Sequence, residues 1–167
     1  MNGRAILLTI CMTLSFLSSG QAQTSPDNQG QQQPSPPPPY RPGLGDLMTM
    51  SVQPRHIKLG LAGREKNWPY AAYELHELEE SFERAARIWP KWRSVAITET
   101  MRAMMQEPMI ALSEAIKHGD SARFTPAYQA LTEACNLCHQ SADRGMIVIQ
   151  VPQSSPFPDQ DFRSRQP

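Results

Sequence analysis

The chain has 167 residues, which suits a single domain, and its charges balance, with 16 Lys and Arg against 16 Asp and Glu. A nucleic-acid-binding domain carries a basic excess, so this balance argues against one and we expect no nucleic acid among the partners. Only three cysteines occur, at positions 11, 135 and 138. The placement of each cysteine is therefore informative.

Residues 1–22 have the pattern of a secretory signal peptide. Arg4 supplies the positive start, Ala5 to Leu17 form an apolar run too short to span a bilayer, and small residues lead to a cleavage site after Ala22. We expect export to the periplasm, with an uncleaved anchor as the alternative. Cleavage would remove Cys11, and no other apolar run is long enough to cross a membrane.

Residues 23–43 are rich in Gln, Ser and Pro and include four consecutive prolines, Pro36 to Pro39. Such a segment can neither run as a helix nor bury much apolar surface. We expect a flexible to semi-extended linker that tethers the domain. A ligand for a proline-binding domain is the alternative.

Residues 44–147 carry the apolar periodicity of an antiparallel four-helix bundle, so we expect an all-α domain. The first helix is expected over Asp46 to Ala62, with Gly63 as its stop. Pro54 should break this helix into a short first turn and a longer second piece. The second helix is expected over Trp68 to Ile88.

The third helix is expected over Thr98 to His118, with Pro108 dividing it into two pieces. The fourth should begin at the N-cap Asp120 and end near Arg144. A short strand-like pattern covers Met146 to Val151. Residues 148–167 form a tail with two aromatic residues among prolines, either laid over the domain or disordered.

The residues Cys135, Cys138 and His139 form a C-x-x-C-H pattern, which is typical of covalent haem c attachment. Each thiol can add across a vinyl group of the porphyrin, and the histidine can then bind the iron. The alternatives are a redox dithiol, half of a zinc site, or a dithiol with no role. A zinc site would want a second ligand pair, and a redox dithiol would accompany a βαβ pattern; neither pattern is present.

The attachment residues also lie on the apolar face of the fourth helix. Phe124, Tyr128, Leu131, Cys135 and Cys138 follow one another at steps of four, three, four and three residues. This spacing predicts that the haem face of the helix is its core face, as a cofactor held inside a bundle requires.

The second axial position of the iron would decide function, because a Met or His ligand suits electron transfer and an open position permits gas binding. In an up-down-up-down bundle the end of the fourth helix lies beside the start of the first. Met48 is then level with His139, whereas His56 lies about 12 Å further along the axis. Met48 is thus the first candidate ligand and His56 the second, and Met50 should point away.

Each of these residues also has a simpler interpretation. A methionine on an apolar stripe is often only core packing. His56 could hydrogen-bond a haem propionate instead of the iron. Arg55, Lys58 and Arg144 could neutralise propionates, although surface charge is the default for such residues.

A C-x-x-C-H near the C-terminal end of the last of four helices resembles class II cytochrome c, the cytochrome c-prime group and its low-spin relatives. The run Ala134 to Gln140 is typical of that family, and Leu47-Met48 is similar to its axial methionine region. The segments 67–69, 72–75 and 156–158 look like those of small exported bacterial haem proteins. The resemblance implies a four-helix bundle, a periplasmic location and one haem c.

This resemblance favours a periplasmic monohaem cytochrome that exchanges electrons with redox partner proteins. A five-coordinate protein that binds nitric oxide or carbon monoxide is the second hypothesis, and a haem accessory subunit of a larger redox enzyme is the third. We find no Ser/His/Asp set, phosphate loop or supported carboxylate pair, so we do not expect an enzyme. Family members are often dimers through their first two helices, and nothing in the sequence decides between monomer and homodimer.

Overall fold

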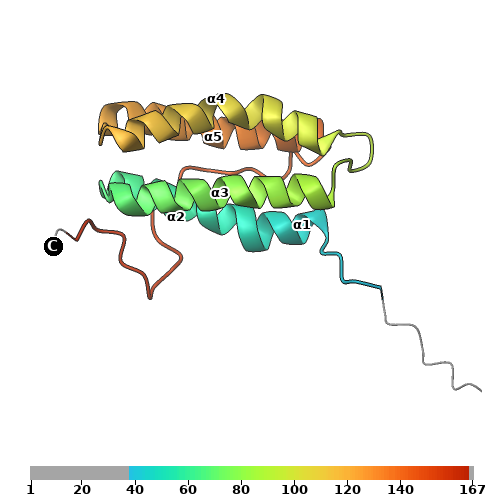
Figure 1. Ribbon diagram of the computed structural model, residues 1–167, viewed down its shortest axis with the longest axis horizontal. Coiled ribbons are helices and arrows are strands. Elements are labelled where there is room, and N and C mark those ends of the chain that lie inside the picture. The colour runs from blue at the N-terminus through green and yellow to red at the C-terminus, as the bar shows by residue number, and fades with distance from the viewer. Residues whose placement is uncertain (1–37, 166–167) are drawn as a thin grey trace, which may run out of the picture. The chain divides into compact units, whose positions relative to one another are not determined.

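A computed structural model describes residues 38–165 of the chain. The expected signal peptide and the linker up to residue 37 lie outside these residues. The described part is all-α and contains four helical rods, the first of which is built from three consecutive segments (Figure 1). The segments are α1 (Leu44–Leu47), η1 (Met48–Val52), α2 (Gln53–Arg64), α3 (Trp68–Ile88), α4 (Ile97–Lys117) and α5 (Ser121–Ser141).

The rods pack against their neighbours in chain order, α2 on α3, α3 on α4 and α4 on α5, and α2 also contacts α5. Figure 1 shows the α2–α3 pair lying along the α4–α5 pair. These contacts are consistent with a bundle and confirm the prediction of an all-α four-helix domain. No helix among residues 38–165 is long and apolar enough to cross a membrane.

A π-helical turn before Pro54 divides the first rod into a short first piece and a longer second piece, as predicted, although the helical path continues through it. Pro54 has no N–H, and in a regular α-helix its ring would clash with the carbonyl of Met50 four residues earlier. The segment η1 before it is π-helical, and the N–H of Gln53 donates to the carbonyl of Met48. The wider turn accommodates the proline, and the three segments follow one another without a gap from Leu44 to Arg64.

The prediction that Gly63 stops the first helix is wrong, because Gly63 is a buried residue within α2. A Cβ at Gly63 would lie 2.0 Å from the ring of Phe124, and one at Gly60 would lie 2.5 Å from Tyr128. The two glycines therefore leave room for aromatic rings of α5. Glycine is therefore needed at these two positions because it has no side chain, and not because it can adopt the backbone conformation of a helix end.

The predicted bounds of α3 agree with the structure, and the side chain of Asn67 caps this helix by accepting from the N–H of Tyr70. In α4 the prediction that Pro108 divides the helix is wrong. Pro108 is buried within a continuous helix whose apolar side packs on its neighbours. Packing of this face outweighs the hydrogen bond that the proline lacks.

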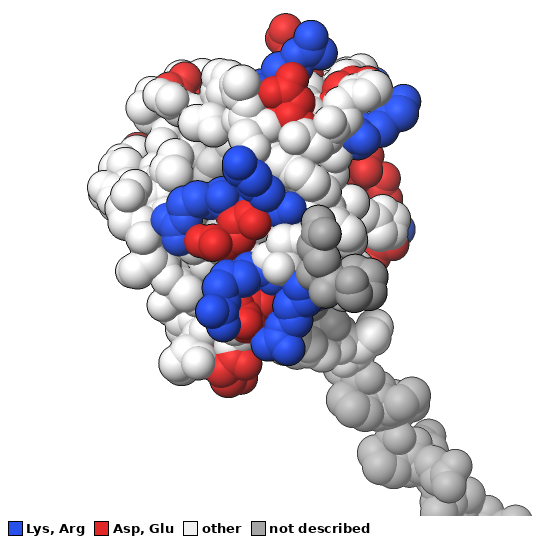
Figure 2. Space-filling model, turned by 90° about the vertical axis from the view of Figure 1, so that its left-hand side faces the viewer, with Lys and Arg blue, Asp and Glu red and all other residues white. Residues whose placement is uncertain are grey.

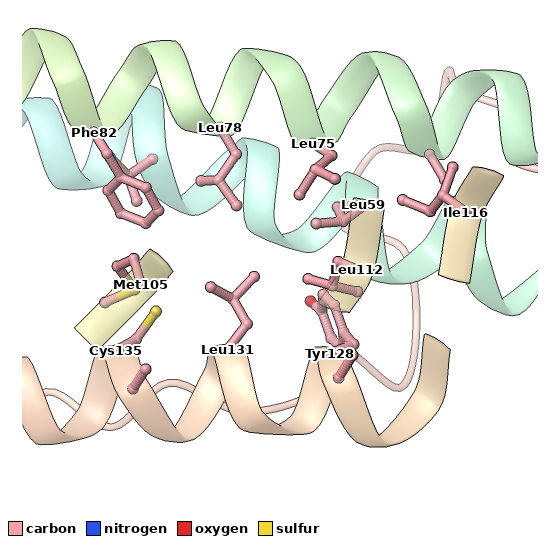
Figure 3. Close-up of a cluster of buried hydrophobic side chains, with 14 of the residues drawn as sticks. Leu59, Leu75, Leu78, Phe82, Met105, Leu112, Ile116, Tyr128, Leu131 and Cys135 are labelled. Carbon is pink, nitrogen blue, oxygen red and sulfur yellow. The ribbon is translucent and has the colours of Figure 1, made fainter. Parts of the chain in front are cut away.

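Asp120 caps α5 by accepting from the N–H groups of Ala122 and Arg123. The helix ends at Ser141, three residues before the predicted end, and Asp143 follows with a positive φ of 55°. The core forms between the helix pairs. Figure 3 shows Leu78 of α3 facing Leu131 of α5.

The residues after α5 run back along the bundle as irregular chain (Figure 1). Met146–Val151 forms no strand, and the backbone of Ile149 is hydrogen-bonded instead to the side chain of Asn136 on α5. Further on, Phe162 is buried and stacks on Tyr70 with ring centroids 5.5 Å apart. The tail is thus anchored to the domain at Phe162.

Figure 2 shows the end of the molecule where α2 ends and α5 begins. On this face the described basic and acidic side chains are intermixed. The face therefore offers no surface of a single charge.

Candidate functional site

A mainly apolar cavity of about 220 Å³ lies between the start of the first rod and the end of α5. The structure brings all five residues predicted for the site to its walls. Cys135, Cys138 and His139 come from α5, Met48 from η1 and His56 from α2. The C-x-x-C-H pattern and both candidate distal residues therefore face one space.

The two thiols are free, with Cys135 buried and Cys138 half-buried. Figure 3 shows the sulfur of Cys135 pointing into the core toward Met105, opposite Phe82. Burial raises the pKa of Cys135 to about 12 and also raises the pKa of Cys138. A redox-active dithiol needs a thiolate near neutral pH, so this environment disfavours dithiol chemistry.

His139 is half-buried, and its Nδ1 lies 2.8 Å from the carbonyl oxygen of Ile147. A carbonyl can only accept, so Nδ1 carries the proton and donates it. The neutral imidazole then keeps its lone pair on Nε2. This is the tautomer in which a histidine binds a metal through Nε2, with its other nitrogen held by a neighbouring acceptor.

The side-chain amide of Asn136 binds the chain segment that contains Ile147, two residues further on at Ile149. Its Nδ2 donates to the carbonyl of Ile149 at 2.9 Å, and the N–H of Ile149 donates to its Oδ1 at 2.7 Å. Ile147 and Ile149 both line the cavity. The sequence did not predict a role for Asn136, Ile147 or Ile149. No local pattern marks a helix side chain that forms hydrogen bonds with the backbone of a later coil segment.

Met48 and His56 differ in whether neighbouring side chains already form hydrogen bonds with them. Met48 is half-buried in the cavity wall, while Met50 is 79% exposed and points away as predicted. His56 is buried, with Nε2 at 3.0 Å from Oγ1 of Thr132 and Nδ1 at 3.1 Å from the hydroxyl of Tyr128. Its imidazole would have to give up a hydrogen bond to coordinate a metal, and Met48 would not.

Burial lowers the pKa of His56 to about 4, so the ring is neutral at neutral pH. The hydroxyl of Tyr128 also lies 2.8 Å from the carbonyl of His56, and that of Thr132 lies 2.9 Å from the carbonyl of Tyr128. The contacts of His56 with Tyr128 and Thr132 join α2 to α5, and the bond from Thr132 to Tyr128 lies within α5. They give His56 a structural role next to the cavity.

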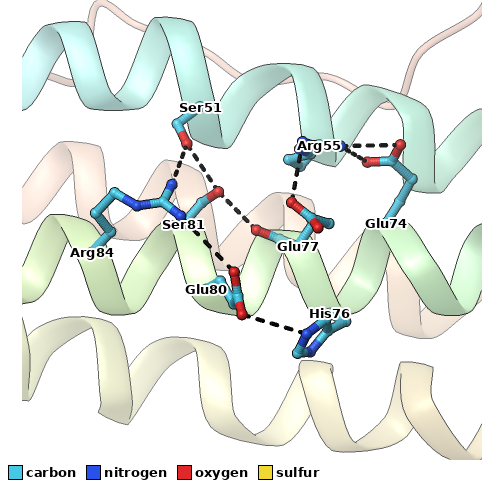
Figure 4. A network of polar contacts seen from close by, with 8 residues as sticks. All are labelled: Ser51, Arg55, Glu74, His76, Glu77, Glu80, Ser81 and Arg84. Carbon is cyan, nitrogen blue, oxygen red and sulfur yellow. Dashed lines mark hydrogen bonds and ion pairs between the residues drawn. The ribbon is translucent and has the colours of Figure 1, made fainter.

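Of the three predicted propionate partners, Arg144 lines the cavity. Arg55 is instead bound to α3, where it pairs with Glu74 at 3.2 Å and with Glu77 at 3.1 Å (Figure 4). Lys58 lies over the ring of Phe157, 4.8 Å from its centroid. Arg144 is thus the cation that the structure brings to this site.

The residues present suit a covalently held haem. The walls combine two neutral thiols, an imidazole with Nε2 available, apolar side chains and one guanidinium. The cavity is smaller than the roughly 300–1,000 Å³ typical of small-molecule sites, so its walls must separate to admit a macrocycle. Three flexible or apolar side chains, Phe82, Met101 and Met105, divide it from a groove of about 800 Å³ between α3 and α4.

Among residues 38–165 no group of three His, Cys, Asp or Glu side chains is close enough to hold a metal ion. Cys138 and His139 therefore gain no further protein ligand from the described chain that would complete a zinc site. No protein-family model, curated protein or solved structure matches this chain. The assignment of the site consequently depends on its own geometry and motif.

Proposed function

We propose that this protein is an exported carrier of one covalent haem c and transfers electrons between redox partner proteins in the periplasm. Cys135 and Cys138 are the attachment residues, and His139 is an axial ligand. The observation that carries the proposal is the shared cavity, in which both thiols and an imidazole with a free Nε2 meet. The resemblance of the motif and its position to class II cytochrome c supports it.

Attachment needs no oxidant. Each thiol adds its S–H across a vinyl group, so that an S–C bond forms and the hydrogen goes to the other vinyl carbon. A haem bound here supplies a one-electron couple between ferric and ferrous iron. The chain's own part is to exclude water with apolar walls, to orient His139 and to offer Arg144 to a propionate.

Met48 is the proposed second axial ligand. It lines the cavity without a competing hydrogen bond, and it lies at the start of the π-helical turn that accommodates Pro54. Segments of π-helix often occur at functional sites. His56 is the alternative, and its two ring contacts argue against it.

Expression of the full chain in bacteria that carry a periplasmic haem-attachment system tests the proposal. We expect one covalent haem per chain, measured as haem that stays with the protein in a denaturing gel and as a matching mass increase. The double variant Cys135→Ala/Cys138→Ala should carry none. Cys11→Ala is the matched control and should load like the natural chain, whereas a natural chain without covalent haem would refute the proposal.

A further inference from the structure

We propose that Asn136 is a positioning residue, whose side-chain amide holds the segment Ile147–Ile149 so that the Ile147 carbonyl fixes the tautomer of His139. The inference rests on the proposed function for the role of His139. The positioning itself depends only on contacts within the protein.

Asn136 and His139 of α5 bind two residues of one short segment, Ile149 and Ile147, which are separated by a single residue. Asn136 and His139 are three residues apart and so lie on the same side of α5. The side-chain amide of Asn136 forms hydrogen bonds with both the N–H and the carbonyl of Ile149, and His139 donates to the carbonyl of Ile147. Ile147 and Ile149 therefore both turn backbone groups toward the helix.

Apart from these hydrogen bonds, the described residues of this stretch contact the bundle through the half-buried side chain of Ile149, which packs against the core. The N–H of Ile147 donates to the carbonyl of Arg144, which closes a turn but does not reach the helix. Met146 and Val148 are 76% and 63% exposed, so their side chains do not anchor the segment. The next contacts with the bundle come at Pro152 and Gln153, whose carbonyls accept from Arg64 on the first rod.

Asn136 thus fixes both backbone polar groups of Ile149, two residues beyond the Ile147 carbonyl that accepts from His139. A hydrogen bond from Nδ1 of a ligating imidazole raises the basicity of the other nitrogen. A more basic axial ligand favours the ferric state of the iron and lowers its reduction potential. Loss of the asparagine should therefore free His139 to change tautomer and should raise the potential of the loaded protein.

The first test uses the haem-free chain and nitrogen NMR of ¹⁵N-histidine, which distinguishes the Nδ1–H from the Nε2–H tautomer. We expect the natural chain to hold His139 as the Nδ1–H form and Asn136→Ala to give a mixture. Asn136→Asp keeps the acceptor for the Ile149 N–H and loses the donor, so it should fall between them. Gln129→Ala removes an exposed amide from the same helix and should match the natural chain.

Amide hydrogen exchange at Ile149 shows whether the hydrogen bonds between Asn136 and Ile149 are lost, because Asn136→Ala removes the acceptor of the Ile149 N–H. Faster exchange at Ile149 with an unchanged His139 tautomer would overturn the inference. The same tautomer mixture in Asn136→Ala and Gln129→Ala would also overturn it.

The second test measures the reduction potential of the loaded chains, which should be higher in Asn136→Ala than in the natural chain and in Gln129→Ala. Equal potentials in all three would overturn the link to the iron. If no chain takes up haem, the proposed function fails, and the NMR result still decides whether Asn136 positions His139.

Discussion

The ring of Phe124 on α5 occupies the space where a side chain at Gly63 on α2 would begin, since an added Cβ would lie 2.0 Å from its Cζ atom. We therefore expect Gly63→Ala to force the two helices apart and to lower the free energy of unfolding by about 1–3 kcal/mol, the usual cost of overpacking a core. Urea unfolding followed by circular dichroism measures the loss.

Gly45→Ala is the matched control, because a Cβ there would meet nothing within 4 Å. Alanine has the higher helix propensity, so this change in α1 should leave stability equal or raise it by about 0.5–1 kcal/mol. Equal losses in the two variants would mean that the contact with Phe124 is not the cause.

Local signals predicted most of the fold. Trp68–Ile88 was correctly bounded because Asn67 caps its start and Trp89-Pro90 follows its end, and both signals act within a few residues. Gly63 was misread because a glycine that ends a helix and one that admits a distant ring look the same in sequence. What separates them is Phe124, which is far away along the chain.

The same limit applies to the site. Helical spacing predicted that Cys135, Cys138 and His139 share a face, and the structure brings them to one cavity. It could not predict that the Ile147 carbonyl would meet His139 or that Asn136 would clasp Ile149, since these contacts depend on how the chain returns after α5.

In the ion-pair network between α2 and α3, the two partners Arg55 and Glu74 should differ in what their loss costs in stability (Figure 4). The Glu74 side chain is 1% exposed and pairs with Arg55, whereas Arg55 also pairs with Glu77. Arg55→Met would leave a buried carboxylate without this cation and should cost about 3–5 kcal/mol of unfolding free energy. Glu74→Met should cost less, because Arg55 keeps Glu77.

The double variant Arg55→Met/Glu74→Met should recover most of the loss, since neither charge is then left alone in the helix interface. Urea unfolding of the three variants gives the coupling energy. A double variant whose loss equals the sum of the two single losses would show that the two charges do not interact.

His56 should make the stability of the domain depend on pH. Burial lowers its pKa from 6.5 to about 4, so the unfolded chain binds a proton between these values and the folded chain does not. Its contribution is therefore full above pH 6.5 and is lost as the pH falls toward 4. Between pH 7 and pH 5 this loss amounts to about 2 kcal/mol.

Urea unfolding of the haem-free chain at pH 7 and pH 5 measures this effect. His56→Gln should be less stable at pH 7, because it disturbs the contacts with Tyr128 and Thr132, but its loss between pH 7 and pH 5 should be about 2 kcal/mol smaller than that of the natural chain. His118→Gln changes an exposed histidine and should keep the natural pH dependence. An unchanged pH dependence in His56→Gln would exclude His56 as the titrating group.

Met48 carries the most direct prediction about the iron, and it depends on the proposed function. If Met48 fills the second axial position, the loaded natural chain should have a low-spin optical spectrum with a methionine–iron charge-transfer band, and Met48→Ala should turn the iron high-spin. Met50→Ala is the matched control, because Met50 is two residues away and 79% exposed, so its spectrum should not change. A low-spin Met48→Ala protein would eliminate Met48 and make His56 the next ligand to test. A natural chain that is already high-spin, with a spectrum that shifts on addition of carbon monoxide, would instead favour the gas-binding alternative over electron transfer.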